Sequence, residues 1–74
     1  MPEKYIELNA FLKINSLAPT GGRVKLLIRS GAISVNGEVE TRNKRKLHAG
    51  DVIVHQVKKF IVEEAVLREH VKAE

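Results

Sequence analysis

The stretch SVNGEVETRNKRK, from Ser34 to Lys46, decides the fold. Its first half places Asn36-Gly37 between two short segments that can each form a strand. Asn-Gly is the strongest short hairpin signal, because a type I′ turn needs a positive φ angle at both central residues. We therefore predict strands over residues 32–35 and 38–40, joined by this turn.

The second half of the stretch is a run of positive charge. Residues 41–46 read Thr-Arg-Asn-Lys-Arg-Lys, so four of the six are cationic. A stable strand needs one apolar side, which this run lacks, so we predict an exposed connection. Exposed charges contribute little stability, and we therefore expect alanine at all four cations to leave the fold intact.

Two segments upstream have helical periodicity, residues 5–16 and 23–30. Pro and Gly interrupt the pattern between them, Thr20 is suited to cap the second helix, and Gly31 is suited to end it. The apolar stripes are Leu8, Phe11, Leu12 and Asn15 in the first segment and Val24, Leu27 and Ile28 in the second.

Downstream, Gly50-Asp51 predicts a turn, with strands over 52–54 and 60–62. The charged tail, 63–74, fits a short amphipathic helix or a frayed terminus equally well. The order predicts one domain over 1–74 (core about 5–62) of the α+β class, with two N-terminal helices packed on a small antiparallel sheet of about four short strands.

Positive charge is concentrated in the middle of the chain. Residues 13–46 hold eight basic and two acidic residues, a balance of 8 − 2 = +6, whereas the whole chain carries +4. Such a distribution favours a polyanionic partner. Charge alone leaves an ordinary solvated surface as an equal alternative.

The composition does not point to catalysis or to a cofactor. The chain has no cysteine, and its three histidines lie far apart, so we expect neither a zinc site nor catalytic residues. Gly21-Gly22 lacks the spacing of a phosphate-binding loop, although the following helix start could receive a phosphate oxygen. No export signal or membrane segment is visible, and we expect a cytoplasmic protein.

The segments YIELNAFLKI and GGRVKLLIRSGAISVNGEVETRNKRKLHAGDVI resemble the S-four (S4) RNA-binding domain, the alpha-L motif. The resemblance rests on the leucine-rich opening helix, the Ile-x-x-Gly end of the second helix, Val-Asn-Gly and Gly-Asp, and it covers roughly residues 5–54. The family usually has Ser-Arg at the second helix start. Here residues 20–23 read Thr-Gly-Gly-Arg, similar to the small stand-alone bacterial YaaA/YbcJ group.

The resemblance implies a non-enzymatic protein that binds structured RNA, with ribosomal and precursor RNA as candidates. We expect the protein to be a monomer. It implies an RNA face made of the two helices and the loop after the hairpin. By position, that face comprises Lys13, Thr20, Arg23, Lys25, Arg29, Arg42, Lys44, Arg45 and Lys46. The low aromatic content independently disfavours a stacking platform for single strands.

Two other functions remain open at this point. A winged-helix-like DNA-binding protein would place the second helix in the major groove, although only two helices precede the hairpin. A protein–protein adaptor would use its sheet edge or tail for docking and its basic face only for solubility. Competition between duplex DNA and structured RNA distinguishes a DNA-binding protein from an RNA-binding one. Replacing Arg42, Lys44, Arg45 and Lys46 by alanine distinguishes an adaptor, whose RNA binding would be unchanged while its binding to a protein partner would be lost.

Overall fold

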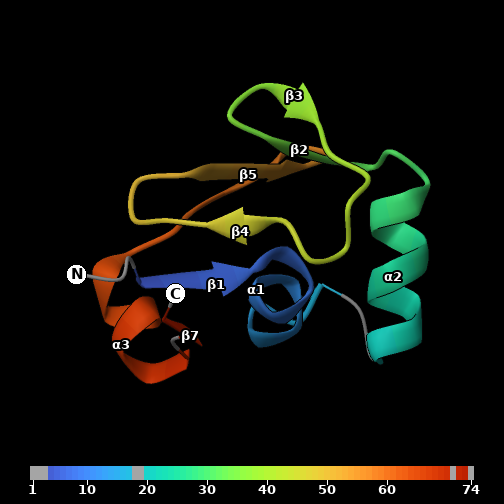
Figure 1. Cartoon of the computed structure of the whole chain (residues 1–74). Coiled ribbons are helices and arrows are strands. Elements are labelled where there is room, and N and C mark those ends of the chain that lie inside the picture. Colours follow the sequence, from blue (N-terminus) through green and yellow to red (C-terminus); the bar gives the residue numbers. More distant parts are fainter. Residues whose placement is uncertain (1–3, 18–19, 71, 74) are drawn as a thin grey trace.

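The structure, a computed structural model, describes residues 4–17, 20–70 and 72–73 (Figure 1). Its elements are β1 (Lys4–Glu7), α1 (Leu8–Ile14), α2 (Gly21–Arg29), β2 (Ile33–Val35), β3 (Glu38–Val39), β4 (Lys46–Leu47), β5 (Val52–His55), β6 (Lys58–Ile61), α3 (Glu64–His70) and β7 (Lys72–Ala73). None of the helices in this described part is long and apolar enough to span a bilayer.

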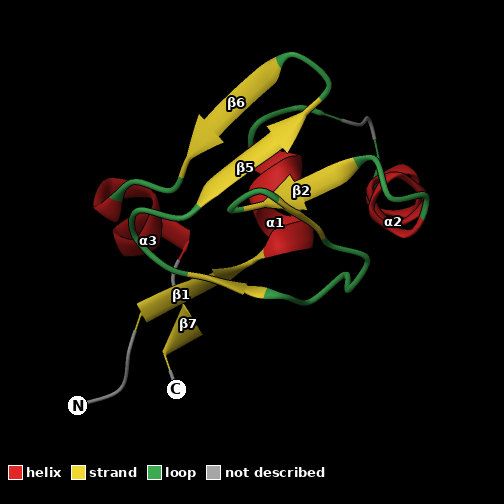
Figure 2. Cartoon of the chain, turned by 90° about the horizontal axis from the view of Figure 1, so that it is seen from above, coloured by secondary structure: helices red, strands yellow, loops and turns green. Residues whose placement is uncertain are grey.

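The strands form two antiparallel sheets, which confirms the predicted α+β class. The larger sheet has the order β3-β2-β5-β6, and a smaller one has the order β4-β1-β7. Figures 1 and 2 show α1 beneath the larger sheet, with α2 at one end and α3 at the other. The sequence predicted the larger sheet but neither the smaller sheet nor a definite third helix.

The Asn-Gly hairpin forms as predicted and is tied to the Gly-Asp turn. Asn36 and Gly37 have φ angles of 52° and 86°, the left-handed values that a type I′ turn requires. The Asn36 side chain accepts a hydrogen bond from the Val52 N–H (2.9 Å) and donates one to the Asp51 carboxylate (3.2 Å). Two of the motifs on which the family resemblance depends, Val-Asn-Gly and Gly-Asp, therefore contact each other and set the register of β2 against β5.

The caps of α2 also agree with the sequence. Thr20 Oγ1 accepts a hydrogen bond from the Arg23 N–H at 3.2 Å, which is the N-cap geometry. Gly31 has a φ angle of 82° just beyond the helix, where a residue with a Cβ would be strained. The helix begins at Gly21, two residues earlier than predicted.

The prediction of a helix from residue 5 was wrong for its first turn. Residues 5–7 belong to β1, in which Ile6 pairs with Leu47 of β4, and both side chains are fully buried. The pairing also places Lys46 in β4. The connection predicted over residues 41–46 therefore ends at Arg45. This contact joins segments 41 residues apart in the sequence, and local periodicity carries no information about it.

The core lies between α1 and the larger sheet, and α3 extends it. Phe11 and Leu12 of α1 pack with Ile33 and Ile53 of the sheet, and all four are buried. Leu67 of α3 is 3% exposed and joins the same cluster. The C-terminal segment thus forms the helix that its spacing allowed, with Leu67 in the core and Val66 packed against it.

Candidate nucleic-acid interface

The segment between β3 and β4, residues 40–45, which we call the basic loop, is attached to the start of α1. The Leu8 N–H donates to the Arg45 carbonyl at 2.8 Å, and the Asn9 N–H donates to the Asn43 carbonyl at 3.0 Å. Glu7, the residue before α1, makes no side-chain cap. Loop carbonyls therefore satisfy N–H groups that a helix start leaves unpaired, and this fixes the loop backbone.

Glu40, the first residue of the basic loop, points toward the protein interior. Its N–H donates to the Ile33 carbonyl at 2.9 Å, so the hairpin pairing continues one residue beyond β3. Opposed residues of an antiparallel pair share one face, and Ile33 lies in the core. Glu40 is consequently only 6% exposed, whereas its neighbour Val39 is 67% exposed on the opposite face.

Two arginines of the same loop satisfy this buried carboxylate. Arg42 binds both oxygens, through Nε to Oε2 at 3.0 Å and Nη2 to Oε1 at 3.1 Å, and its backbone N–H adds a bond of 3.0 Å. Arg45 Nη1 donates to Oε1 at 2.6 Å. These hydrogen bonds, those from the Arg42 side chain above all, lower the pKa of Glu40 from 4.5 to about 2.

The role of Glu40 was missed in the sequence, where it counted only as an acid opposing the basic run. The available signal was its register, because pairing outward from Asn36-Gly37 places Glu40 opposite an inward-facing isoleucine. The structure argues against the expectation that all four cations of residues 41–46 can be replaced by alanine without a loss of stability. Removing Arg42 or Arg45 leaves a buried carboxylate with fewer partners, which is unfavourable.

The four cations surround one hollow on the surface. Its volume is about 430 Å³, and its lining consists of Arg42, Lys44, Arg45 and Lys46. Lys46 also lies over the Tyr5 ring, with Nζ 5.0 Å from the ring centroid. A concave surface lined by guanidinium and ammonium groups can accept several oxygens of a phosphate backbone at once.

The remaining predicted contacts lie on or beside α2. Lys13, at the end of α1, has its Nζ 4.0 Å from where a Cβ on Gly21 would stand, so its ammonium lies near the α2 N-terminus. In Figures 1 and 2 the basic loop runs beside α2. The structure thus brings the loop and this helix to one end of the molecule.

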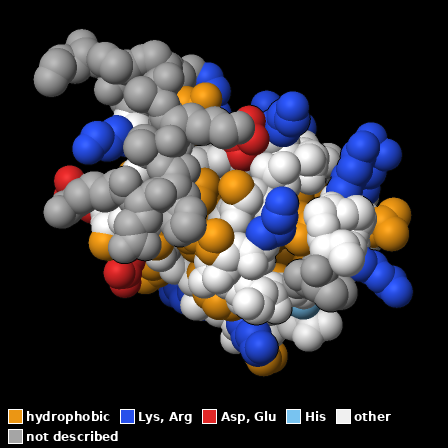
Figure 3. All heavy atoms as spheres, turned by 90° about the horizontal axis from the view of Figure 1, so that it is seen from below, with side chains coloured by type: hydrophobic (Ala, Val, Ile, Leu, Met, Phe, Trp, Pro, Cys, Tyr) orange, Lys and Arg blue, Asp and Glu red, His pale blue; other side chains and the backbone are white. Residues whose placement is uncertain are grey.

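The cations of α2 are exposed but do not share one flank. At about 100° per residue, Lys25 and Arg29 lie about 40° apart around the helix, whereas Arg23 lies about 160° from Lys25. Leu26, which is 63% exposed, stands between the two flanks. Figure 3 shows several Lys and Arg side chains at the α2 end and others elsewhere on this face, whereas the acidic side chains in view lie away from the α2 end.

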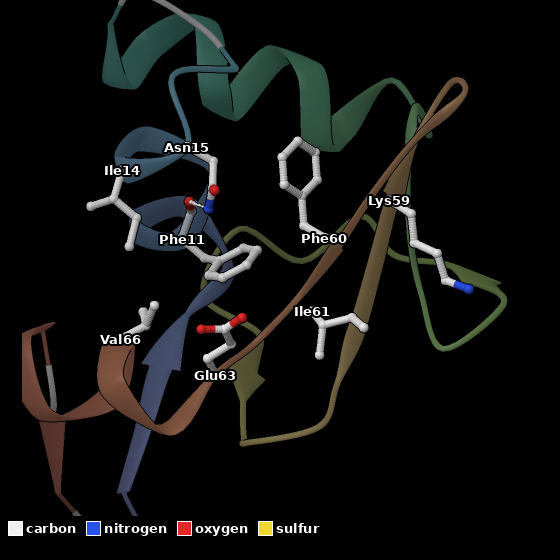
Figure 4. A pocket seen from close by; sticks show the side chains of 8 residues that line it. All are labelled: Phe11, Ile14, Asn15, Lys59, Phe60, Ile61, Glu63 and Val66. Atoms are coloured by element: carbon white, nitrogen blue, oxygen red, sulfur yellow. Dashed lines mark hydrogen bonds between the residues drawn. The ribbon is translucent and has the colours of Figure 1, made fainter.

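A second hollow, of about 490 Å³, lies between α1, β6 and α3 (Figure 4). Its lining mixes the rings of Phe11 and Phe60 with Lys59 and Glu63, so no single chemistry dominates it. Within the described residues, no group of three or more His, Cys, Asp or Glu side chains could hold a metal ion. The basic loop is therefore the better candidate site.

A family model agrees with this geometry. The model described as the S4 domain matches residues 1–63, most of the 74 residues. The chain belongs to the S4 domain family. The resemblance that the sequence showed over residues 5–54 is confirmed, and no solved structure gives a significant match.

Two relatives of this S4 domain have informative names. One, from Escherichia coli strain K12, is named "Putative RNA-binding protein YbcJ" and is 35% identical over 49 residues, 66% of this chain and 70% of that protein. Another, from Bacillus subtilis strain 168, is named "Probable ribosome maturation protein RlbA" and is 38% identical over 48 residues, 65% of this chain and 68% of that protein.

The buried carboxylate makes the stability of this S4 domain depend on pH. Because folding lowers the pKa of Glu40 to about 2, its contribution is complete above about pH 4.5 and is lost as the pH falls toward 2. Between pH 7 and pH 2.5, we expect the free energy of unfolding of the original chain to fall by roughly 1 to 3 kcal/mol more than that of Glu40→Gln, which has no carboxyl group to titrate at this position. Urea unfolding of both proteins at pH 7 and pH 2.5 measures it. An unchanged difference between the proteins would contradict the prediction.

Proposed function

We propose that this S4 domain is a non-enzymatic protein that binds structured RNA through the basic loop and α2. The proposal rests on the hollow lined by Arg42, Lys44, Arg45 and Lys46. The backbone of the basic loop is hydrogen-bonded to the start of α1, and Glu40 binds both arginines. Family membership and the name of the Escherichia coli relative support an RNA partner.

In the proposed mechanism, phosphate contacts supply most of the affinity. Lys44 of the basic loop, Lys46 of β4, and Lys25 and Arg29 of α2 neutralise phosphates and release their counterions. Such contacts fix position and orientation, whereas shape supplies the selectivity, because a double-helical RNA spaces its phosphates differently from DNA. Lys13, Thr20 and Arg23, near the start of α2, extend the proposed face around the helix to the flank beyond Leu26.

Folded RNA fits this surface better than single strands. The chain has three aromatic residues, Tyr5, Phe11 and Phe60. Phe11 is buried, and Tyr5 and Phe60 are half-buried. Tyr5 is half-buried and already carries the Lys46 ammonium over its ring. Single-strand binders rely on exposed rings on which bases stack, so we propose a duplex or folded partner.

The name of the Bacillus subtilis relative directs the proposal toward ribosomal or precursor RNA. We also propose that the protein acts in the cytoplasm. The test is a titration of the protein with an RNA hairpin, a DNA duplex of the same sequence and a single strand, each at several salt concentrations. Three or four phosphate contacts from the cations of residues 41–46 alone predict micromolar-scale affinity and a log–log salt slope near −3, and contacts from Lys25 and Arg29 of α2 make the slope steeper.

The alternatives are outcomes of the same titration. Equal or tighter binding to the DNA duplex would favour a DNA-binding protein. A flat salt slope, or no binding to any nucleic acid, would contradict the proposal and leave the adaptor function. Crosslinking and sequencing of RNA bound in cells then identifies the natural partner.

A further inference from the structure

We propose that Glu40 is a positioning residue for RNA binding, which holds the guanidinium groups of Arg42 and Arg45 where phosphates reach them. The proposal rests on the proposed function and concerns an acidic residue inside a cationic site. Electrostatics alone would make Glu40 unfavourable there, because it repels the phosphates that its neighbours attract. Its position must therefore be explained by what it does to the arginines.

The contact geometry fixes the Arg42 guanidinium as a unit. Glu40 accepts from Nε and from Nη2 on its two oxygens, the bidentate arrangement that orients a planar guanidinium. A guanidinium has five N–H donors, so three of those on Arg42 remain for other acceptors. The side chain of Arg42 is 73% exposed, which leaves these donors accessible from solvent.

The carboxylate is itself held in place. Its side chain is 8% exposed, and its backbone N–H is bonded to Ile33 of the core-facing β2. Arg45 binds the same carboxylate at 2.6 Å, and the Arg45 carbonyl accepts from the first turn of α1. One buried anion thus connects two loop cations to the rigid part of the fold.

Such an arrangement removes a cost of binding. An exposed arginine or lysine loses rotamer freedom when it contacts a phosphate, which weakens the complex. Glu40 orders Arg42 and Arg45 before the RNA binds, so these side chains lose less rotamer freedom when they contact phosphates. Lys44 has no hydrogen bond or ion pair within the described residues and represents the unordered case.

The test compares variants in which charge and position change separately. Glu40→Gln removes the negative charge, but an amide offers one acceptor oxygen and two N–H groups and cannot hold the Arg42 fork. Glu40→Asp keeps the charge but shortens the reach. Glu38→Gln is the matched control. Glu38 is exposed on β3 of the same hairpin, and its substitution removes the same charge as Glu40→Gln.

Affinity for an RNA hairpin and its salt slope are measured for all four proteins, after a thermal melt confirms folding. We expect Glu38→Gln to bind as the original chain does or slightly tighter. We expect Glu40→Gln and Glu40→Asp to bind about fivefold to 20-fold more weakly, with a slope shallower by about one to two phosphate contacts. A merely smaller folded fraction would lower the affinity without changing the slope.

Each other outcome overturns the positioning role. Glu40→Gln binding as tightly as Glu38→Gln would show that only charge matters. If Glu40→Gln fails to fold, Glu40→Asp decides, and unchanged affinity and slope there would reject the proposal. Failure of both to fold would make Glu40 a determinant of stability instead. If the original chain bound no RNA, the proposed function itself would fail, which is a separate result.

Discussion

A variant with Lys25, Arg29 and Lys44 all changed to glutamine is expected to bind structured RNA about 100-fold more weakly near physiological salt. Each phosphate contact releases close to one counterion and contributes about fivefold at that salt, so three lost contacts multiply to this order. These three side chains make no hydrogen bond or ion pair within the described residues. The substitutions should therefore leave the melting temperature nearly unchanged.

Titration with the same RNA hairpin at several salt concentrations measures the effect, and the salt slope should fall by two to three units in magnitude. The matched control is Lys4, Lys58 and Lys59 changed to glutamine, which removes the same charge from β1 and β6, outside the proposed face. Equal weakening by the two triple variants would show that net charge, not the α2 and loop surface, determines binding.

Phe11→Ala is expected to cost about 3 to 5 kcal/mol of the free energy of unfolding. Phe11 is 1% exposed, and its ring lies between α1 and the sheet, so truncation removes apolar contacts and leaves a cavity. The total free energy of unfolding of a domain of this size is about 4 to 11 kcal/mol. The variant should therefore lose most of its stability and melt at a much lower temperature.

Ile14→Ala is the control for this prediction. Ile14 belongs to the same helix but is 40% exposed, so its truncation should cost less than about 1 kcal/mol. Urea unfolding followed by circular dichroism measures both variants. Similar losses for the two would mean that helix propensity, rather than burial of the ring, limits the stability.

Local chemistry predicted the parts of the fold that short-range rules control. The Asn36-Gly37 turn, the Thr20 cap and the Gly31 helix end follow from φ preferences and hydrogen-bonding groups present within a few residues. The resemblance to the S4 family used the same signals and was confirmed. The nine proposed RNA contacts were named from position and charge, and titration remains their test.

Long-range pairing decided the rest. Residues 5–7 continue the periodicity of α1, yet they form β1 because burying Ile6 against Leu47 and pairing the backbone outweigh one helical turn. By itself, the sequence determined the hairpin, the second helix and the density of positive charge beside the turn. Only the tertiary structure decided that Glu40 is buried beneath that charge, because its environment depends on which residues of β2 and the loop surround it.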